Sequence, residues 1–222
     1  MKRPLIVLEG LDGSGKATQT AQLCNVLEQR GTPHRRLQFP DYDQPSSALV
    51  KLYLNGELGS EPHSVNAYAA ASFYAVDRYA GFVRFWQQDW QNGVCLVADR
   101  YTTSNLIYQL AKLPQAEWDA FIRWVEAYEY DKLGLPRPDV VLYLDVPPEI
   151  SQRLLHVRYR GDEACKDIHE RNTAYLAQCR TAALYSAQRL GWHVIACAEN
   201  GEMKSVEAIH QEILRVLSDM GM

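Results

Sequence analysis

A glycine-rich stretch near the N-terminus carries the residue types that bind phosphate groups. The run Gly10-Leu11-Asp12-Gly13-Ser14-Gly15-Lys16 fits the pattern G-x-x-x-x-G-K. Glycines allow backbone N–H groups to converge on phosphate oxygens, and the N-terminus of a following helix adds partial positive charge. Lys16 can then reach the β- and γ-phosphate oxygens. The pattern predicts a phosphate-binding loop, and the alternative is a glycine turn with a surface lysine.

Two positions in this loop bear on a metal ion. Ala17 follows Lys16, where a Ser or Thr hydroxyl normally holds Mg²⁺. Thr18 is the next hydroxyl, but one step along a helix turns it away by about 100°. Asp12 places a carboxylate among phosphate-binding amides, which is repulsive unless a cation or a hydroxyl group lies there too. We expect Asp12 to organise Mg²⁺ or to bind the substrate; the alternative is a loop aspartate that caps its own backbone.

A second set of polar residues, Asp99-Arg100-Tyr101, directly follows an apolar run at residues 94–98. Open α/β sheets bind ligands beyond the carboxyl ends of their strands, so this set and the glycine-rich loop should share one crevice. Arg100 offers a planar fork of donors to a phosphate, and Asp99 is a second candidate for holding Mg²⁺. The alternative is a structural ion pair between Asp99 and Arg100 or a neighbour.

Two pairs of side chains could hold a planar base. Tyr74 and Arg78 are four residues apart in a helical stretch, and Asn105 and Tyr108 are three apart, so each pair shares a helix face. An aromatic ring can stack on a base, while Arg and Asn can bond its polar edge. Taken alone the pattern is weak, because a tyrosine stripe on an alanine-rich helix is more often part of a core.

Strand-like and helix-like segments alternate along the chain and define the elements that must position these residues. Right-handed crossovers between buried parallel strands give a three-layer α/β/α domain with a five-stranded parallel sheet. No repeat or linker interrupts it, so a single domain over residues 1–222 is expected. The predicted strands are 5–9, 36–39, 94–98, 140–144 and 193–196, and the predicted helices are 18–30, 46–54, 64–91, 103–111, 115–130, 148–157, 168–190 and 203–220.

Composition excludes several classes of protein. The chain has 222 residues, of which 47% are hydrophobic, so it can bury a sizeable core. With 23 Lys and Arg against 27 Asp and Glu, the net charge of −4 argues against a general nucleic-acid coat protein. No apolar run is long enough to cross a membrane, and the N-terminus does not read as a signal peptide. Five scattered cysteines favour reduced thiols in a cytoplasmic protein over disulfides or a zinc site.

Several of these motifs together resemble the thymidylate kinase family. The resemblance is continuous from about residue 4 to 110, and resumes at 139–145 and, more loosely, at 158–175. The pattern D-R-Y-x-x-S-N-x-x-Y, from Asp99 to Tyr108, is its most specific part because it belongs to the acceptor site of that family. The residues that carry the resemblance are 10–19, Phe39-Pro40-Asp41-Tyr42, Leu54-Asn55-Gly56, Tyr74-Ala75-Val76-Asp77-Arg78, and 99–105 with Tyr108.

The resemblance implies a P-loop kinase fold and transfer of the γ-phosphoryl group of ATP to dTMP, with Mg²⁺. It assigns ATP binding to Gly10, Leu11, Asp12, Gly13, Ser14, Gly15, Lys16, Ala17 and Thr18. On the acceptor side, Arg100 would bridge the donor and acceptor phosphates, and Tyr74 would stack on thymine. Arg78 and Asn105 would read the edge of the base, and Tyr108 would crowd the sugar 2′ position. Phe39 and Pro40 would shape the pocket, with Asp12 near the sugar or the metal.

The resemblance also implies a lid that closes over the donor, around residues 157–167. Some family members carry a catalytic arginine in the phosphate loop and others in the lid. Gly13 stands at the loop position here, which points to Arg158 and Arg160, with Arg153 in reserve. Asp41 stands where many members have an arginine. Family members are commonly homodimers; the open alternatives are a kinase for another deoxynucleotide or nucleoside and a non-catalytic P-loop nucleotide-binding protein.

Overall fold

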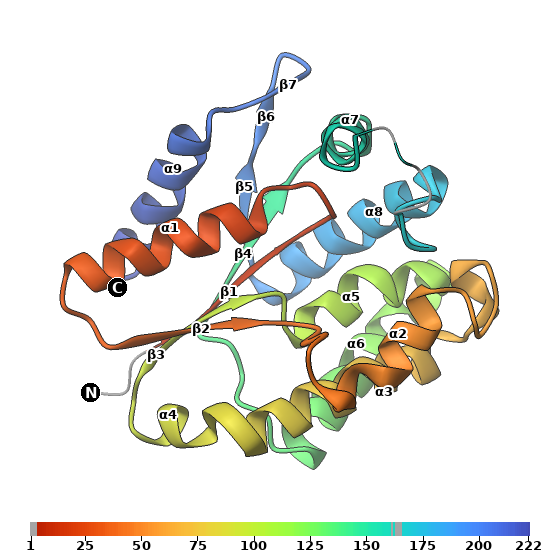
Figure 1. The fold of residues 1–222 in the computed structure, drawn as a ribbon, viewed down its shortest axis with the longest axis horizontal. Helices are drawn as coiled ribbons and strands as arrows, with labels where there is room; N and C mark the ends of the chain where they lie inside the picture. Colours follow the sequence, from red (N-terminus) through yellow and green to blue (C-terminus); the bar gives the residue numbers. More distant parts are fainter. Residues whose placement is uncertain (1–3, 161, 163–165) are drawn as a thin grey trace.

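The computed structural model describes residues 4–160, 162 and 166–222, apart from the side chain of Arg158. Its centre is a five-stranded parallel sheet in the order β2-β3-β1-β4-β5, which confirms the predicted α/β class (Figure 1). The strands are β1 (Leu5–Gly10), β2 (His34–Gln38), β3 (Cys95–Asp99), β4 (Val140–Asp145) and β5 (His193–Ala196).

Helices cover both faces of this sheet (Figure 1). Strand β1 shows why: Ile6 and Leu8 pack into a core with α1 and α9, while Leu5 and Val7 point to the opposite face and pack with α5 and α8. Side chains alternate across a strand, so a strand that is apolar at every position must be covered twice. The helices are α1 (Lys16–Gln29), α2 (Ala48–Leu54), α3 (Ala67–Gly81), α4 (Gln87–Gln91), α5 (Asn105–Tyr108), α6 (Trp118–Glu126), α7 (Pro148–Arg158), α8 (Thr173–Leu190) and α9 (Val206–Asp219).

The helix predicted at 64–91 is two helices joined by a π-helical turn. Helix α3 begins at Ala67, because the Asn66 side chain accepts a hydrogen bond from the Ala69 N–H at 2.9 Å and so caps it. The π-turn η3 (Phe82–Trp86) then separates α3 from α4. The hydrophobic pattern does not reveal such a turn, because the apolar face continues through it.

The helix predicted at 168–190 begins later, at Thr173. The Asn172 side chain caps α8 by accepting from the Tyr175 N–H at 2.9 Å. Residues before it form a turn in which Asp167 accepts hydrogen bonds from the N–H groups of His169 and Glu170, at 2.8 and 2.9 Å. This turn, rather than a helix, brings His169 to the cavity described below.

The structure also differs from the predicted helix boundaries near the C-terminus and after β3. The last helix, predicted at 203–220, is α9, and a two-stranded hairpin of β6 (Ala198–Glu199) and β7 (Glu202–Met203) precedes it. The helix predicted at 103–111 is divided into the 3₁₀ turn η4 (Thr102–Ser104), α5 and the 3₁₀ turn η5 (Leu110–Lys112).

The sheet register brings the two predicted sites to one edge. Leu8 of β1 pairs with Asp99 of β3, and the Arg100 N–H donates to the Leu8 carbonyl at 3.0 Å. The glycine-rich loop leaves β1 at Gly10, directly beside the end of β3. Residues 90 positions apart in the sequence therefore meet in one crevice, as expected for the carboxyl ends of parallel strands.

Candidate active site

Close packing around the glycine-rich loop requires glycine at two positions. A Cβ at Gly10 would lie 2.5 Å from the Ser14 Oγ and 2.9 Å from the Leu144 carbonyl. At Gly13, where φ is +80°, a Cβ would lie 2.9 Å from the Ser151 carbonyl of α7. Helix α7 thus rests on the loop, and a long side chain at position 13 would displace it.

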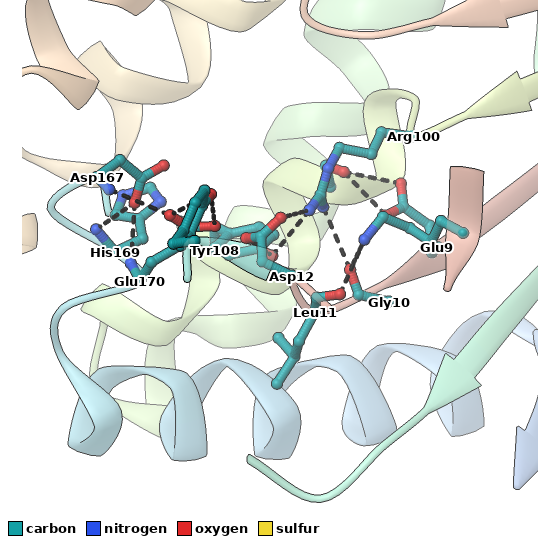
Figure 2. A network of polar contacts seen from close by, with 12 residues as sticks. Glu9, Gly10, Leu11, Asp12, Arg100, Tyr108, Asp167, His169 and Glu170 are labelled. Atoms are coloured by element: carbon teal, nitrogen blue, oxygen red, sulfur yellow. Dashed lines mark hydrogen bonds and ion pairs between the residues drawn. The ribbon is translucent and has the colours of Figure 1, made fainter. Parts of the chain in front are cut away.

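Lys16 lies at the start of α1 and folds back over the loop. Its Nζ donates to the carbonyls of Gly10 at 2.9 Å and Leu11 at 2.8 Å (Figure 2). Burial and the positive charge of Arg100 lower the pKa of Lys16 to about 8. Among the described residues this ammonium group forms no ion pair, and a phosphate would supply the anionic partner.

Arg100 joins the loop to the acceptor side of the crevice. Its Nη2 lies 2.5 Å from the Asp12 Oδ1 and donates to the Tyr108 hydroxyl at 3.2 Å, while Nη1 donates to the Gly10 carbonyl at 3.3 Å (Figure 2). Tyr108 in turn donates to the Asp12 Oδ2 at 2.9 Å. The ion pair considered from the sequence therefore forms, but Arg100 pairs with Asp12 and not with Asp99.

The backbone of Arg100 adopts the left-handed conformation, with φ at +68°. Glu9 holds this turn: its carboxylate accepts hydrogen bonds from the Tyr101 N–H at 3.1 Å and from the hydroxyls of Thr103 and Ser104 at 2.7 and 2.9 Å. Burial raises the pKa of Glu9, although the charge of Arg100 opposes that shift. Glu9 was not predicted as a site residue, although an acidic residue at the end of an otherwise apolar strand was a visible signal.

The carboxylates near the loop fit a Mg²⁺ ion. Burial alone would raise the pKa of Asp12, but the charges of Arg100 and Lys16 outweigh it and hold that pKa below its usual value, so Asp12 is ionised. The Asp99 side chain is nearly buried at 7% exposure, and no hydrogen bond to it is found in the described part of the chain. Within residues 4–160, 162 and 166–222, no group of three His, Cys, Asp or Glu side chains could hold a metal. Mg²⁺ commonly uses only one or two carboxylates together with substrate phosphates and water, so the lack of a three-residue cluster is compatible with the predicted roles of Asp12 and Asp99.

A cavity of about 70 Å³ opens beside Arg100. All the residues predicted to bind the acceptor line it: Phe39, Pro40, Tyr74, Arg78, Arg100, Asn105 and Tyr108. Seven further lining residues were not assigned a site role from the sequence, namely Tyr42, Leu54, Tyr101, Ser104, Gln109, Asp167 and His169. Tyr101, Ser104 and Gln109 stand next to predicted residues in the sequence, whereas Asp167 and His169 reach the cavity from the turn before α8.

Arg78 and Asn105 share a partner that the sequence did not reveal. The Glu129 carboxylate accepts from the Arg78 Nε at 2.7 Å, from the Arg78 Nη2 at 2.6 Å and from the Asn105 Nδ2 at 2.8 Å. The Arg78 and Glu129 side chains are only 2% and 1% exposed. Glu129 lies in the π-turn η7 (Ala127–Lys132).

His169 covers another wall of the cavity. Its ring stacks on Tyr108, with centroids 5.3 Å apart and planes 14° apart, and its Nε2 lies 2.8 Å from the Tyr53 hydroxyl (Figure 2). Burial lowers the pKa of His169 to about 3, and the positive charge of Lys112 acts in the same direction. His169 is therefore a neutral planar group beside Tyr108 at physiological pH.

Of the arginines predicted for the lid, Arg160 and the reserve Arg153 have described side chains, and neither contacts this network. Arg158 ends α7, and its side chain is outside the described part of the structure. Arg160 is exposed, with φ at +53°, and does not line the cavity. Arg153 donates to the Gly201 carbonyl at 2.7 Å and pairs with Glu202 at 3.5 Å, so it contacts the β6–β7 hairpin.

Fold and site together define a P-loop phosphotransferase with an acceptor cavity beside its phosphate loop. Comparison with known proteins agrees: the family model for thymidylate kinase matches residues 8–213. Thymidylate kinase from Mycobacterium tuberculosis H37Rv is 34% identical over 82% of this chain and 84% of its own length. The human thymidylate kinase is 30% identical over 97% of this chain and 89% of its own length. The solved structure of thymidylate kinase from Candida albicans has the same fold, with a TM-score of 0.70 at 22% identity, covering 99% of this chain and 93% of that one.

The chain belongs to the thymidylate kinase family. It is accordingly an enzyme, a phosphotransferase that uses ATP to phosphorylate dTMP. This removes the alternative of a non-catalytic nucleotide-binding protein.

Proposed function

We propose that phosphoryl transfer takes place at Arg100, between ATP on the loop Gly10–Thr18 and dTMP in the adjoining cavity. The observation that carries this assignment is the position of the Arg100 guanidinium, which contacts the loop at Gly10 and Asp12 and the cavity at Tyr108. A single cation at this boundary can contact the phosphates of both nucleotides. Phosphoryl transfer requires two anions held in line and the neutralisation of charge on the transferring group, and it requires little covalent chemistry.

On the donor side, we assign the phosphates to Lys16 and the amides of the loop, as the N-terminus of α1 is free to receive them. Asp12 and Asp99 would hold Mg²⁺, which neutralises phosphate charge when it is bound. Asp12 also orients Arg100 through their ion pair, so its ionised state supports both roles.

We assign the catalytic positive charge of the lid to Arg158 and Arg160. The packing of Gly13 against Ser151 supports this assignment, because it leaves no room for an arginine at the loop position. In this proposal residues 157–167 close over the donor, exclude water and bring an arginine to the transferring group. Residues 1–222 then act as one domain that carries this lid.

On the acceptor side, Tyr74 offers an aromatic face for thymine, and Phe39 and Pro40 close the pocket behind it. The Tyr108 hydroxyl contacts Asp12 and Arg100 at the phosphate end of the cavity. We therefore place the sugar, which adjoins the phosphate, beside the Tyr108 ring. A 2′-hydroxyl buried against its ring without a partner would be unfavourable by about 1–3 kcal/mol. Deoxyribose is therefore the preferred sugar.

We further propose that the enzyme is a cytoplasmic homodimer that acts on small nucleotides and on neither nucleic acid nor membranes. Val76, Tyr79 and Val83 follow one another at helical spacing and are 39%, 43% and 49% exposed. Such an apolar stripe favours a second copy of the chain as its partner. Among the described residues, no helix is long and apolar enough to cross a membrane.

The experiment that tests the proposed acceptor is an ADP-release assay with each deoxy- and ribonucleoside monophosphate. We expect the highest kcat/KM with dTMP, a modest loss with dUMP and large losses with dCMP and ribo-TMP. A different monophosphate preferred by tenfold or more would replace dTMP as the acceptor.

A further inference from the structure

Glu129 lies behind the wall of the acceptor cavity and does not line it. It is nevertheless the common partner of the two side chains assigned to the edge of the base, Arg78 and Asn105. All three residues are buried, with residue exposures of 1% for Arg78, 2% for Asn105 and 1% for Glu129. A buried carboxylate that accepts three hydrogen bonds from two cavity-lining residues constrains which of their atoms remain available to a ligand.

The amide of Asn105 can take only one orientation in this setting. Its Nδ2 donates to the Glu129 Oε1 at 2.8 Å and to the Ala71 carbonyl at 3.3 Å, so both of its hydrogens have acceptors. If the amide were flipped, its oxygen would face two groups that can only accept. The Oδ1, a pure acceptor, is therefore the atom that Asn105 has left for a ligand.

The guanidinium of Arg78 is constrained in the same way. Its Nε and Nη2 form a bidentate pair with Glu129, which uses one side of the planar group. Nη1, on the other side, has no hydrogen-bond partner within the described residues, and it can only donate. The cavity thus receives one donor from Arg78 and one acceptor from Asn105.

We propose that Glu129 is a positioning residue that determines base specificity, by fixing Arg78 as donor and Asn105 as acceptor toward the base. This inference rests on the proposed assignment of the cavity to the acceptor nucleotide. Thymine offers an acceptor at O4 and a donor at N3–H, which complement this pair. Cytosine offers a donor at its 4-amino group and an acceptor at N3, so both of its contacts would be mismatched.

The test substitutes Glu129→Gln, which retains the size of the side chain but replaces one acceptor oxygen with a donor. One of the two acceptors that fix the Asn105 amide can then become a donor. The amide can turn its Oδ1 toward position 129 and present Nδ2 to the base, opposed only by the Ala71 carbonyl among the partners found here. Glu126→Gln is the matched control, because Glu126 ends α6 three residues earlier and pairs with Arg137 at the surface. The measurement is kcat/KM for dTMP, dUMP and dCMP, with KM for ATP.

For Glu129→Gln we expect the ratio of kcat/KM for dTMP over dCMP to fall at least tenfold, mainly through a higher KM for dTMP. The dTMP over dUMP ratio should stay within about twofold of the parent, because uracil has the same polar edge as thymine and lacks only the methyl group. The KM for ATP should not change, and Glu126→Gln should match the parent throughout.

Two results would overturn the inference. One is an unchanged dTMP over dCMP ratio in Glu129→Gln when the parent discriminates between them. The other is an equal loss for all three acceptors, which would mean that Glu129 only supports the cavity wall. A parent enzyme that does not distinguish dTMP from dCMP would instead contradict the proposed base-reading role of Arg78 and Asn105.

A second variant keeps the test decisive if Glu129→Gln folds poorly. Glu129→Asp keeps both acceptor oxygens, so Asn105 should still present its Oδ1 to the base. A folded Glu129→Asp should therefore retain a clear preference for dTMP over dCMP. Loss of that preference in a folded Glu129→Asp with an unchanged KM for ATP would exclude the positioning role.

Discussion

At the scale of single residues, Arg100 combines a strained backbone with the central charge of the site. A φ of +68° is unfavourable for any residue with a Cβ, by about 1 kcal/mol, and glycine tolerates it. The hydrogen bonds of Glu9 to the following turn hold this conformation in place. Strain that the surrounding structure maintains is expected where a side chain must be aimed at a reacting group.

We therefore predict that Arg100→Gly and Arg100→Ala both lower kcat/KM by at least about a hundredfold, because each removes a contact to transition-state charge. The two variants should differ in stability, with Arg100→Gly more stable than Arg100→Ala by about 1 kcal/mol. Steady-state kinetics and urea unfolding measure the two effects, and Arg215→Ala, an exposed arginine of α9, is the control. Near-parental activity of either variant would remove Arg100 from the mechanism.

At the scale of secondary-structure elements, Lys112 connects three segments behind the cavity. From η5 its Nζ donates to the Tyr53 hydroxyl of α2 at 2.7 Å and to the Val65 carbonyl at 3.0 Å. Tyr53 in turn contacts His169 in the turn before α8. No carboxylate pairs with Lys112 in the described ranges. Burial lowers the pKa of Lys112 to about 7, and the nearby Cys179 opposes this shift.

This arrangement predicts a stability that depends on pH. The folded-state pKa of about 7 lies below the usual value of 10.5, so between these values the unfolded chain binds the additional proton. The free energy of unfolding should rise as pH increases from about 7 toward 10, by at most about 1.4 kcal/mol per pH unit. Lys112→Met should remove this contribution, whereas Lys51→Met, at an exposed position of α2, should retain it. Parallel pH profiles for the parent and Lys112→Met would contradict the prediction.

At the scale of the whole molecule, helix α3 has two faces with separate tasks. One face carries Tyr74 and Arg78 to the cavity. The other carries Val76 and Tyr79, and Val83 in η3 continues this exposed stripe. If two copies pair through this stripe, the partner packs against the same helix that forms part of the acceptor pocket. Dimer formation would then limit the movement of one wall of the site.

Accordingly, Val76→Asp should convert a dimeric enzyme into a monomer, since it places a charge at the centre of an apolar interface. Size-exclusion chromatography with light scattering measures the mass. Val206→Asp serves as the control because Val206 is also exposed, at 47% against 39% for Val76, but lies on α9, away from α3 (Figure 1). A parent chain that is monomeric at micromolar concentration would contradict the proposal.

The sequence by itself predicted the five parallel strands, the phosphate loop and, through its resemblance to the thymidylate kinase family, part of the lining of the acceptor cavity. The strands and the loop were predictable because they depend on local order: apolar runs predict buried strands, and strand–glycine–helix succession predicts where anions bind. The carboxyl ends of parallel strands share one edge, so even the meeting of Gly10 with Arg100 followed from the topology.

Only the tertiary structure showed which side chains position the residues of the site through hydrogen bonds. Glu9, Glu129 and His169 come from a strand end, a π-turn and a turn before a helix, and each acts through a partner at least 24 positions away in the sequence. The predicted helix at 168–190 was wrong at its start for the same reason, because the cap at Asn172 and the bonds of Asp167 compete with helical propensity. Propensity and spacing describe residues that are close along the chain. The hydrogen-bond partners of a buried carboxylate come from distant segments, so the packing of the whole molecule determines which residues they are.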